Sequence, residues 1–178
     1  LEENEEVQLQ VTATEKNLNI YGQEAKVSTW VTITVLDVND HKPEFYDCVL
    51  EDCSFTPQEA RDTFIAYVDE HASTRIPVDN LTMVAYDPDK GNNGTFLMSL
   101  GGPDAGAFSV SPGRASGSAE VQVLVRNSEM VDYENKSVML VQVVATDLVS
   151  KKSSIAMVTI LAYVDEHAST RIPVDNLT

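Results

Sequence analysis

The sequence has no long apolar run, only two cysteines and few basic residues. No stretch approaches the roughly 18 apolar residues that a membrane-spanning helix needs, and no N-terminal signal sequence is visible. Leu1 is followed by two glutamates, as expected for a segment of a longer chain. Twelve basic residues against 28 acidic ones give the 178-residue chain a formal charge of −16. This charge argues against nucleic acid and anionic lipid as partners, because both would be repelled, and it suits a polycation or a multivalent metal ion.

The cysteines and four asparagines favour an extracellular location. Cys48 and Cys53 lie close enough to close a local disulfide loop, and two free thiols are the alternative. Four Asn-x-Ser/Thr triplets are candidate glycosylation acceptors: Asn80, Asn93, Asn135 and Asn176. Disulfides and N-linked glycans are both features of secreted chains, so together these residues predict an extracellular protein.

Short strands dominate the expected secondary structure. Apolar and polar residues alternate over residues 7–15 and 139–147, the period of a strand with one buried face. Each of these segments is followed by a second expected strand, at 31–35 and 157–160. The best helical candidate is 56–66, where Thr56 and Glu59 have capping-box spacing and one or two helical turns are expected. Turns rich in glycine and proline separate the other segments, which predicts an antiparallel β-sandwich.

Acidic residues gather in two short segments, DVNDHKPEF at 37–45 and DPDKGNNG at 87–94. Closely spaced carboxylates within tight turns supply the oxygen ligands that calcium prefers. Zinc is disfavoured because the histidines are scattered and no Cys/His cluster is present. The second segment is not an EF-hand loop, because Met98 stands where that loop requires a bidentate glutamate.

With these two segments, and with VDYENKSVMLVQVVATD at 131–147, the chain resembles the cadherin superfamily, in particular the non-classical, protocadherin-like cadherins. The first segment is similar to the inter-repeat linker motif DxND(N/H)xPxF. The second is similar to the DxDxGxNG loop of the following repeat, and the third to the LDYE segment and the strand that ends in A-x-D. The resemblance implies tandem all-β repeats, each an antiparallel Greek-key β-sandwich. It divides the chain into the end of one repeat with its calcium linker, 1–43, and a near-complete repeat, 44–161.

The resemblance also implies which residues bind Ca2+. The ligands that it assigns to this linker are Glu2, Asp37, the carbonyls of Val38 and His41, Asn39, Asp40, Asp87, Asp89, the carbonyl of Asn93, and Asp147. Glu70, Asp132 and Glu134 correspond to the ligands that a repeat offers to its next linker. Two carboxylates of the upstream repeat would precede Leu1, so the ion site nearest the downstream repeat is expected to be the most complete.

Two segments depart from the family pattern. Residues 46–69 are longer than a plain first strand and contain both cysteines. They indicate an insertion, either a stabilised surface loop or a cap on the linker. Residues 162–178 repeat residues 66–82 without a difference, at the place where the next linker is expected. A sequence artefact or disorder is our first explanation, ahead of a recent duplication and of a strand exchanged between molecules in which Glu166 would bind calcium.

These observations predict an ectodomain fragment in calcium-dependent cell–cell adhesion, in which Ca2+ rigidifies the linker. The expected partners are other cadherin ectodomains, homophilic or heterophilic, on a parent chain anchored in the plasma membrane. Neither nucleic acid nor a small-molecule substrate is expected. An enzyme is not expected, because the chain lacks G-x-S-x-G, HExxH and phosphate-loop motifs, although Asp132 and Glu134 would suit a glycosidase. A calcium-free immunoglobulin-like binding module is the other alternative.

Overall fold

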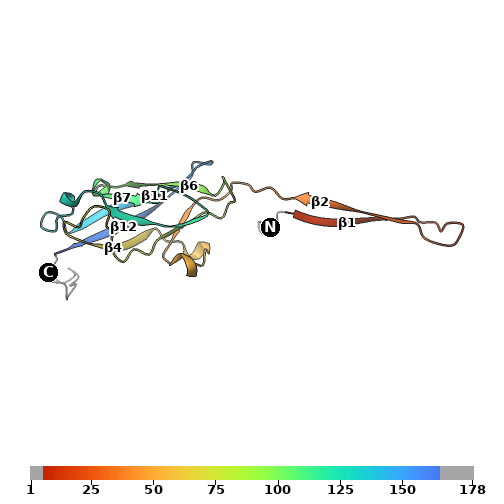
Figure 1. Cartoon of the computed structure of the whole chain (residues 1–178), viewed down its shortest axis with the longest axis horizontal. Coiled ribbons are helices and arrows are strands. Elements are labelled where there is room, and N and C mark those ends of the chain that lie inside the picture. The colour runs from red at the N-terminus through yellow and green to blue at the C-terminus, as the bar shows by residue number, and fades with distance from the viewer. Residues whose placement is uncertain (1–5, 165–178) are drawn as a thin grey trace. The chain divides into compact units, whose positions relative to one another are not determined.

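The first unit of the structure, a computed structural model that describes residues 6–164, is a two-stranded hairpin. Contacts divide the chain into Leu1–Val38 and Asn39–Thr178. Strands β1 (Glu6–Thr14) and β2 (Lys26–Thr34) pair antiparallel, with Leu9 opposite Val31 (Figure 1). Directly opposed residues share a face, so the alternating apolar residues lie together on one side of the hairpin. The first predicted strand is confirmed, whereas the second begins five residues earlier than predicted.

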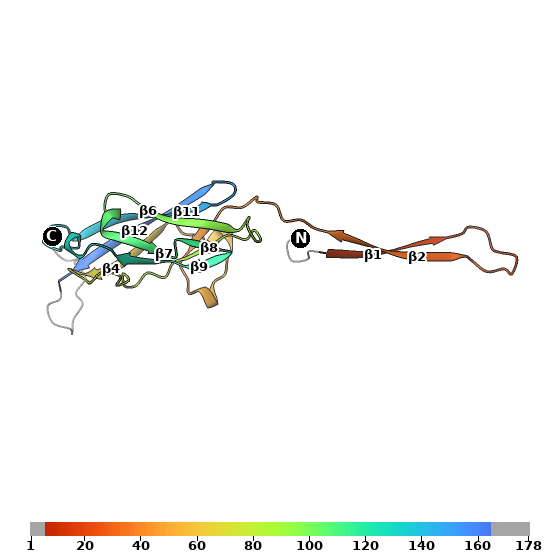
Figure 2. The same cartoon turned by 45° about the horizontal axis from the view of Figure 1, so that its top comes forward.

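The second unit is a β-sandwich, which confirms the predicted fold class (Figures 1 and 2). One layer is a five-stranded sheet in the order β4-β12-β11-β6-β8, and the other contains the sheet β3-β5-β9 and the pair β10-β7. The strands are β3 (Glu44–Tyr46), β4 (Thr63–Asp69), β5 (Val84–Tyr86), β6 (Thr95–Gly101), β7 (Phe108–Ser111), β8 (Arg114–Ser116), β9 (Ser118–Glu120), β10 (Gln122–Val125), β11 (Val138–Asp147) and β12 (Ser153–Tyr163).

One strand pair departs from the antiparallel prediction. Strands β4 and β12 run parallel, with Phe64 opposite Val158, whereas the other paired strands of this unit are antiparallel. The chain starts this unit as β3 beside β5 in one layer, and after residues 47–62 it enters the other layer as β4. The segment expected to form the first strand is therefore divided between the two layers, and its second half fills the edge beside β12.

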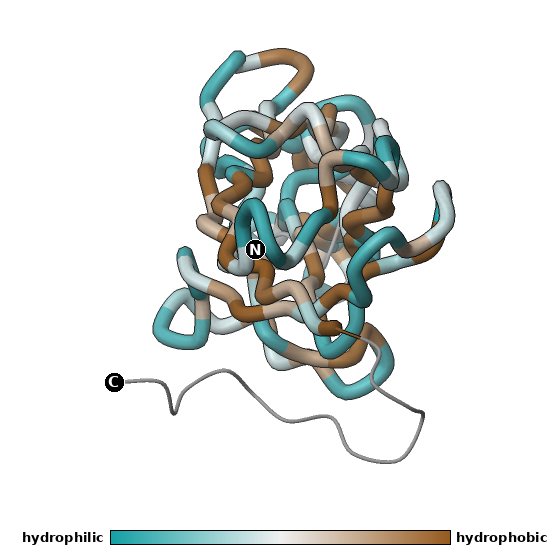
Figure 3. Tube along the Cα trace, turned by 90° about the vertical axis from the view of Figure 1, so that its left-hand side faces the viewer, coloured by the Kyte–Doolittle hydropathy of each residue, from teal (hydrophilic) through white to brown (hydrophobic). Residues whose placement is uncertain are grey.

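The core lies between the two layers and follows the predicted period-two alternation. Every second residue of β11 and β12 is almost inaccessible to water: Met139, Val141, Val143 and Ala145 on β11, and Ala156, Val158, Ile160 and Ala162 on β12. The rings of Phe45, Phe64, Phe96 and Phe108 join them from four other strands. In Figure 3 hydrophobic stretches, drawn in brown, alternate with paler and teal stretches along the chain.

The predicted helical segment forms a single turn. The 3-10 helices η1 (Leu50–Asp52) and η2 (Pro57–Glu59) lie in the insertion, while η3 (Ala105–Ala107) and η4 (Ser128–Met130) lie in later loops. The side chain of Thr56 makes no capping hydrogen bond, and β4 begins at Thr63. The prediction of one to two turns over 56–66 is thus met only at its start, because pairing with β12 takes the later residues into a strand.

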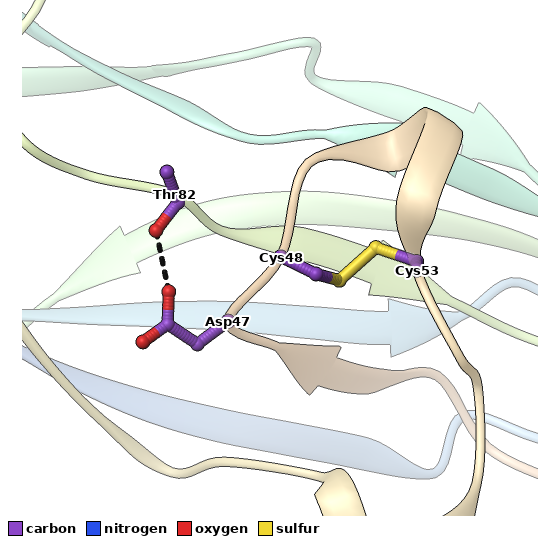
Figure 4. Close-up of a disulfide and its surroundings, with 4 residues drawn as sticks. All are labelled: Asp47, Cys48, Cys53 and Thr82. Carbon is purple, nitrogen blue, oxygen red and sulfur yellow. Dashed lines mark hydrogen bonds between the residues drawn. A yellow bond between two sulfur atoms is a disulfide. The ribbon is translucent and has the colours of Figure 1, made fainter.

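A disulfide closes the insertion. The sulfurs of Cys48 and Cys53 are bonded, and their Cα atoms lie 5.4 Å apart (Figure 4). Next to this loop, the hydroxyl of Thr82 donates a hydrogen bond to the carboxylate of Asp47. Beyond the disulfide, the Phe55 ring stacks on Tyr86 with centroids 4.0 Å apart and meets Tyr46 edge-on at 5.3 Å. The insertion therefore covers the outer side of the β3-β5-β9 sheet.

Strand β12 continues into the duplicated segment. Tyr163 pairs with Asp69 of β4, and its ring stacks on Tyr67, the residue that it duplicates, with centroids 5.2 Å apart. The strand predicted to end at residue 160 therefore extends to Tyr163. Glu166 and Asn176 lie outside the described residues, and the expectations about them stay predictions. Among residues 6–164, no helix is long and apolar enough to cross a membrane.

The alternation along β12 predicts very different effects for two isoleucines of that strand. Ile160 is 0% exposed and Ile155 is 51% exposed. Ile160→Ala should lower the free energy of unfolding by about 2–5 kcal/mol, because it leaves a cavity between the layers, whereas Ile155→Ala should cost less than about 1 kcal/mol. Urea unfolding of both variants at one fixed calcium concentration measures the difference. Equal losses would contradict the assignment of the two faces.

Candidate metal centre

The strand register brings the predicted acidic segments to one end of the sandwich. Strand β3 begins beside the end of β5, because Glu44 pairs with Tyr86. Strand β11 ends beside the start of β6, because Asp147 pairs with Phe96. The segments 39–41 and 87–93 therefore meet the carboxylate of Asp147, although they are far apart in the sequence.

Asn39 links two of these segments through its side-chain amide. Its Nδ2 donates to Oδ2 of Asp147 at 2.8 Å and to the carbonyl oxygen of Asn93 at 3.0 Å. Its Oδ1 is buried and has no hydrogen-bond partner among the described residues. An amide oxygen that is buried without a donor is costly unless something else fills its place, so this oxygen is available as a ligand.

Asp87 presents a second oxygen of this kind. Its side chain is 1% exposed, and its Oδ1 accepts a hydrogen bond from the backbone N–H of Asp89 at 3.1 Å. Its Oδ2 is buried and has no partner in the described part of the chain. The pKa of Asp87 is raised to about 6, mainly by burial and also by the charges of Asp89 and Asp147, which together outweigh the lowering effect of that hydrogen bond and of His41.

Asp147 is held in its charged form. Burial alone would raise its pKa, but hydrogen bonds from the backbone of Ser150, from the amide of Asn39 and from the backbone of Val149 bring the pKa below its ordinary value. The two backbone donors reach Oδ1 at 2.9 Å and 2.6 Å. This carboxylate therefore stays negative beside Asp87.

His41 contributes a side chain where only its carbonyl was predicted to act. Its Nδ1 lies 2.8 Å from Oδ1 of Asp89 and 2.8 Å from Oδ1 of Asp40, and its backbone N–H donates to Oδ2 of Asp89 at 3.1 Å. Together these residues form a group of possible metal ligands whose atoms lie within 4.8 Å of one another. A motif that assigns His41 a carbonyl role carries no signal for its ring, because the ring position depends on the fold of the 87–94 loop.

The 87–94 loop owes its shape to its glycines. Gly91 has a φ of +58°, a conformation that costs glycine no steric strain. A Cβ atom on Gly94 would overlap the backbone carbonyl oxygen of Asp89. Only glycine at residue 94 therefore lets the loop close tightly enough to keep Asp87 and Asp89 together.

A second acidic group contains Glu70, Asp132 and Glu134, which were predicted to serve the next linker. Their carboxylate oxygens lie within 4.8 Å of one another. Oε2 of Glu70 is buried and has no hydrogen-bond partner among residues 6–164. These three residues are close enough to share a cation. Without a cation, their negative carboxylates would repel one another at these distances.

For three further predicted ligands the assignment stays a prediction. Asp37 and Val38 belong to the first unit, and Glu2 lies outside the described residues. Of the glycosylation candidates, Asn80 and Asn135 are exposed, while Asn93 is partly buried within the acidic loop.

The donor set fits calcium. It consists of carboxylate, amide and carbonyl oxygens, the hard ligands that calcium takes in flexible geometry. Two of these oxygens, on Asn39 and Asp87, are buried and have no hydrogen-bond partner within residues 6–164. Only one imidazole and no thiol stand near them in the described groups, so zinc, which prefers nitrogen and sulfur, fits less well.

Fold and site together define a class of protein: a β-sandwich repeat with an acidic cluster at the end where a linker enters. The chain is 71% identical over 171 residues to human cadherin-related family member 2, a match that covers 96% of this chain and 13% of that protein. It is 72% identical over 166 residues to the mouse protein of the same name, covering 93% of this chain and 13% of the relative. The chain belongs to the cadherin superfamily.

Solved structures show the same fold. Mouse cadherin-23 EC22-24 has a TM-score of 0.63 at 24% identity and covers 92% of this chain and 44% of that one. Protocadherin gamma B2 extracellular domains 1–5 have a TM-score of 0.65 at 20% identity and cover 91% of this chain and 27% of that one. No protein-family model matches the chain. The chain spans about 13% of the length of the cadherin-related proteins that it matches.

The backbone of Asp89 passes so close to Gly94 that any side chain at residue 94 should disturb the acidic loop. Gly94→Ala should separate Asp87 from Asp89, lower the melting temperature and weaken divalent-cation binding, because the added methyl group meets backbone that cannot move aside. Gly113→Ala is the matched control, since a Cβ there meets nothing within 4 Å. Thermal unfolding with and without calcium measures both effects. Equal behaviour of the two variants would contradict this account of the loop.

The raised pKa of Asp87 predicts a pH dependence in the metal-free protein. A carboxyl group with a pKa of about 6 in the folded state and 3.8 as its ordinary value binds a proton more tightly when folded. The contribution of this proton to the free energy of unfolding is fully present below pH 3.8, and it is lost as the pH rises through about 6. Metal-free protein should therefore gain more stability than Asp87→Asn when the pH falls from about 7 to about 5. Urea unfolding at both pH values tests this, and an equal gain in the two proteins would refute it.

Proposed function

We propose that the chain is a segment of a cell-adhesion ectodomain and that calcium ions bind at its acidic end to stiffen the linker between repeats. This proposal is supported above all by two buried side-chain oxygens, one on Asn39 and one on Asp87. Both lie among carboxylates and have no hydrogen-bond partner among the described residues. Membership of the cadherin superfamily supports the same reading. The ligands would be those of the linker motif: Glu2, Asp37, Asn39, Asp40, Asp87, Asp89 and Asp147, with the carbonyls of Val38, His41 and Asn93.

Charge explains what the ions would do. Without a cation, the carboxylates of Asp87, Asp89 and Asp147 repel one another, and two unit charges about 4 Å apart interact by about 4 kcal/mol near a protein surface. Shared coordination replaces this repulsion by attraction. Since Asp37 and Asp40 lie on the linker and the other aspartates on the repeat, a shared ion would restrict the angle between repeats. The proposed output of the site is therefore a fixed geometry rather than a reaction.

The family membership supports the remaining parts of the proposal. The parent protein would be anchored in the plasma membrane with this segment outside the cell, and its partners would be cadherin ectodomains. Glu70, Asp132 and Glu134 would serve the next linker in the same way. No enzymatic role is proposed. A calcium-free immunoglobulin-like binding module would not explain why the carboxylates are buried together.

Calcium titration tests the proposal. Calcium at about 100 times its dissociation constant should stabilise the protein by roughly 2.7 kcal/mol, seen as a rise in melting temperature. Asp87→Asn should lose most of this rise, because it removes a buried charged ligand. Asp62→Asn, a change in an exposed aspartate that belongs to neither acidic group, is the matched control and should keep it.

The order of the sites can be tested in the same titration. Glu2→Ala should weaken calcium binding less than Asp87→Asn, since Asp87 belongs to the site expected to be most complete. A melting temperature that does not respond to calcium would refute the proposal. Equally tight binding at every site of the linker would refute only the order.

A further inference from the structure

A cavity of about 510 Å³ lies where the disulfide insertion meets the end of the sandwich that holds the metal centre. Its lining residues come from 40–46, from 55–57 in the insertion, from 86–88 and from residue 152. These segments are far apart in the sequence, so the cavity exists only in the folded unit. Its volume is that of a small-molecule site. The insertion, which the family pattern leaves unexplained, thus forms one wall of a pocket.

Rings make up much of the lining. Five of the ten lining residues are aromatic or proline: Tyr46, Phe55, Pro57, Tyr86 and Pro88. The Phe55 ring contacts both tyrosine rings, and the disulfide closes the loop just before it. The aromatic surface is therefore held in place before a ligand arrives, which lowers the entropy lost on binding. Surfaces of this kind pack against the C–H groups of a ring-shaped ligand.

Two lysines also line the cavity, although basic residues are scarce in this chain. Lys42 and Lys152 are both exposed, and neither takes part in an ion pair with another described residue. The chain has 28 acidic residues against 12 basic ones, so carboxylates that could pair with them are abundant. Their ammonium groups are donors on flexible stems, and they make the cavity a place where an anion from another molecule can bind.

The two carboxylates of the cavity each have one partner and can accept further hydrogen bonds. Oδ1 of Asp40 lies 2.8 Å from Nδ1 of His41, and Oε2 of Glu44 accepts a hydrogen bond from the Tyr46 hydroxyl at 3.4 Å. A carboxylate has about four acceptor sites, so each has room for the hydroxyl groups of a ligand. The cavity therefore offers two cations, several acceptors and an aromatic wall together.

We propose that this cavity binds an acidic sugar of the sialic acid type, a sugar that ends many extracellular glycans. Its carboxylate pairs with the ammonium groups of Lys42 and Lys152. Its hydroxyl groups donate to Asp40 and Glu44, and the C–H face of its ring packs on Phe55. The cavity selects a sugar over an acidic peptide, because a peptide carboxylate satisfies the lysines but brings no ring of hydroxyl groups for the acceptors.

This activity differs from the proposed stiffening of the linker. It gives the segment a way to recognise glycans on another molecule through a small pocket. Of the side chains that bind the sugar, only Asp40 is also a proposed calcium ligand. The sugar and the calcium ions therefore depend on largely separate residues, and the two proposals can fail separately.

Amide NMR spectra of the full 178-residue chain, titrated with the α-methyl glycoside of N-acetylneuraminic acid, test this inference. Saturable shifts should appear for residues that line the cavity, both with calcium and without it. Lys42→Met and Lys152→Met should each weaken binding about fivefold or more, because each removes a charged hydrogen-bond donor. Both lysines are exposed, so these variants should keep the melting temperature of the unchanged chain, which circular dichroism verifies.

Lys151→Met is the matched control for the loss of charge. Lys151 is the neighbouring exposed lysine, its Nζ donates to the carbonyl oxygen of Leu148, and it does not line the cavity. The dissociation constant of this variant should stay within about twofold of that of the unchanged chain. A loss of binding as large as that of Lys152→Met would overturn the proposal, because it would show attraction to positive charge in general.

Two further ligands separate the sugar from its parts. Methyl galactoside has hydroxyl groups without the carboxylate, and N-acetylglutamic acid amide has the carboxylate without the sugar ring. Each should bind at least about tenfold more weakly than the sialic acid glycoside, because each lacks one set of partners. The absence of saturable shifts at the cavity would overturn the proposal. So would equal binding of the glutamate derivative, which would show a site for acidic peptides instead.

Discussion

Carboxylates that are buried together must be neutralised, and this constraint governs the end of the sandwich where the linker enters. Asp87, Asp89 and Asp147 are each no more than 4% exposed. Each finds a different local compensation: Asp147 accepts backbone hydrogen bonds, Asp89 faces His41, and the pKa of Asp87 rises. A divalent cation would neutralise all three carboxylates at once, because calcium takes carboxylate oxygens as ligands.

The loops at this end have their shape because of that constraint. Gly94 permits the close return of the chain past Asp89, and the amide of Asn39 crosses from the linker to Asn93 and Asp147. These hydrogen bonds tie the linker to the repeat that follows it, which is why the compact units divide after Val38.

The outer faces of the two layers differ in whether a loop covers them. The disulfide loop covers the smaller sheet with Phe55, whereas the larger sheet presents an uncharged row centred on Thr159.

The sequence by itself predicted several of the strands and that the acidic residues of the two motifs would lie together. Alternation along β11 and β12 is a local property, so it predicted their buried faces, whereas β1 alternates in the same way but is exposed throughout. The motifs predicted that Asp87, Asp89 and Asp147 would meet. Only the tertiary structure decided that β4 joins the larger sheet in parallel, that the ring of His41 enters the acidic group, and that the outer face lacks charge. These features depend on which strands become neighbours and in which direction they run. Such pairings join residues far apart in the chain, and no local pattern records them.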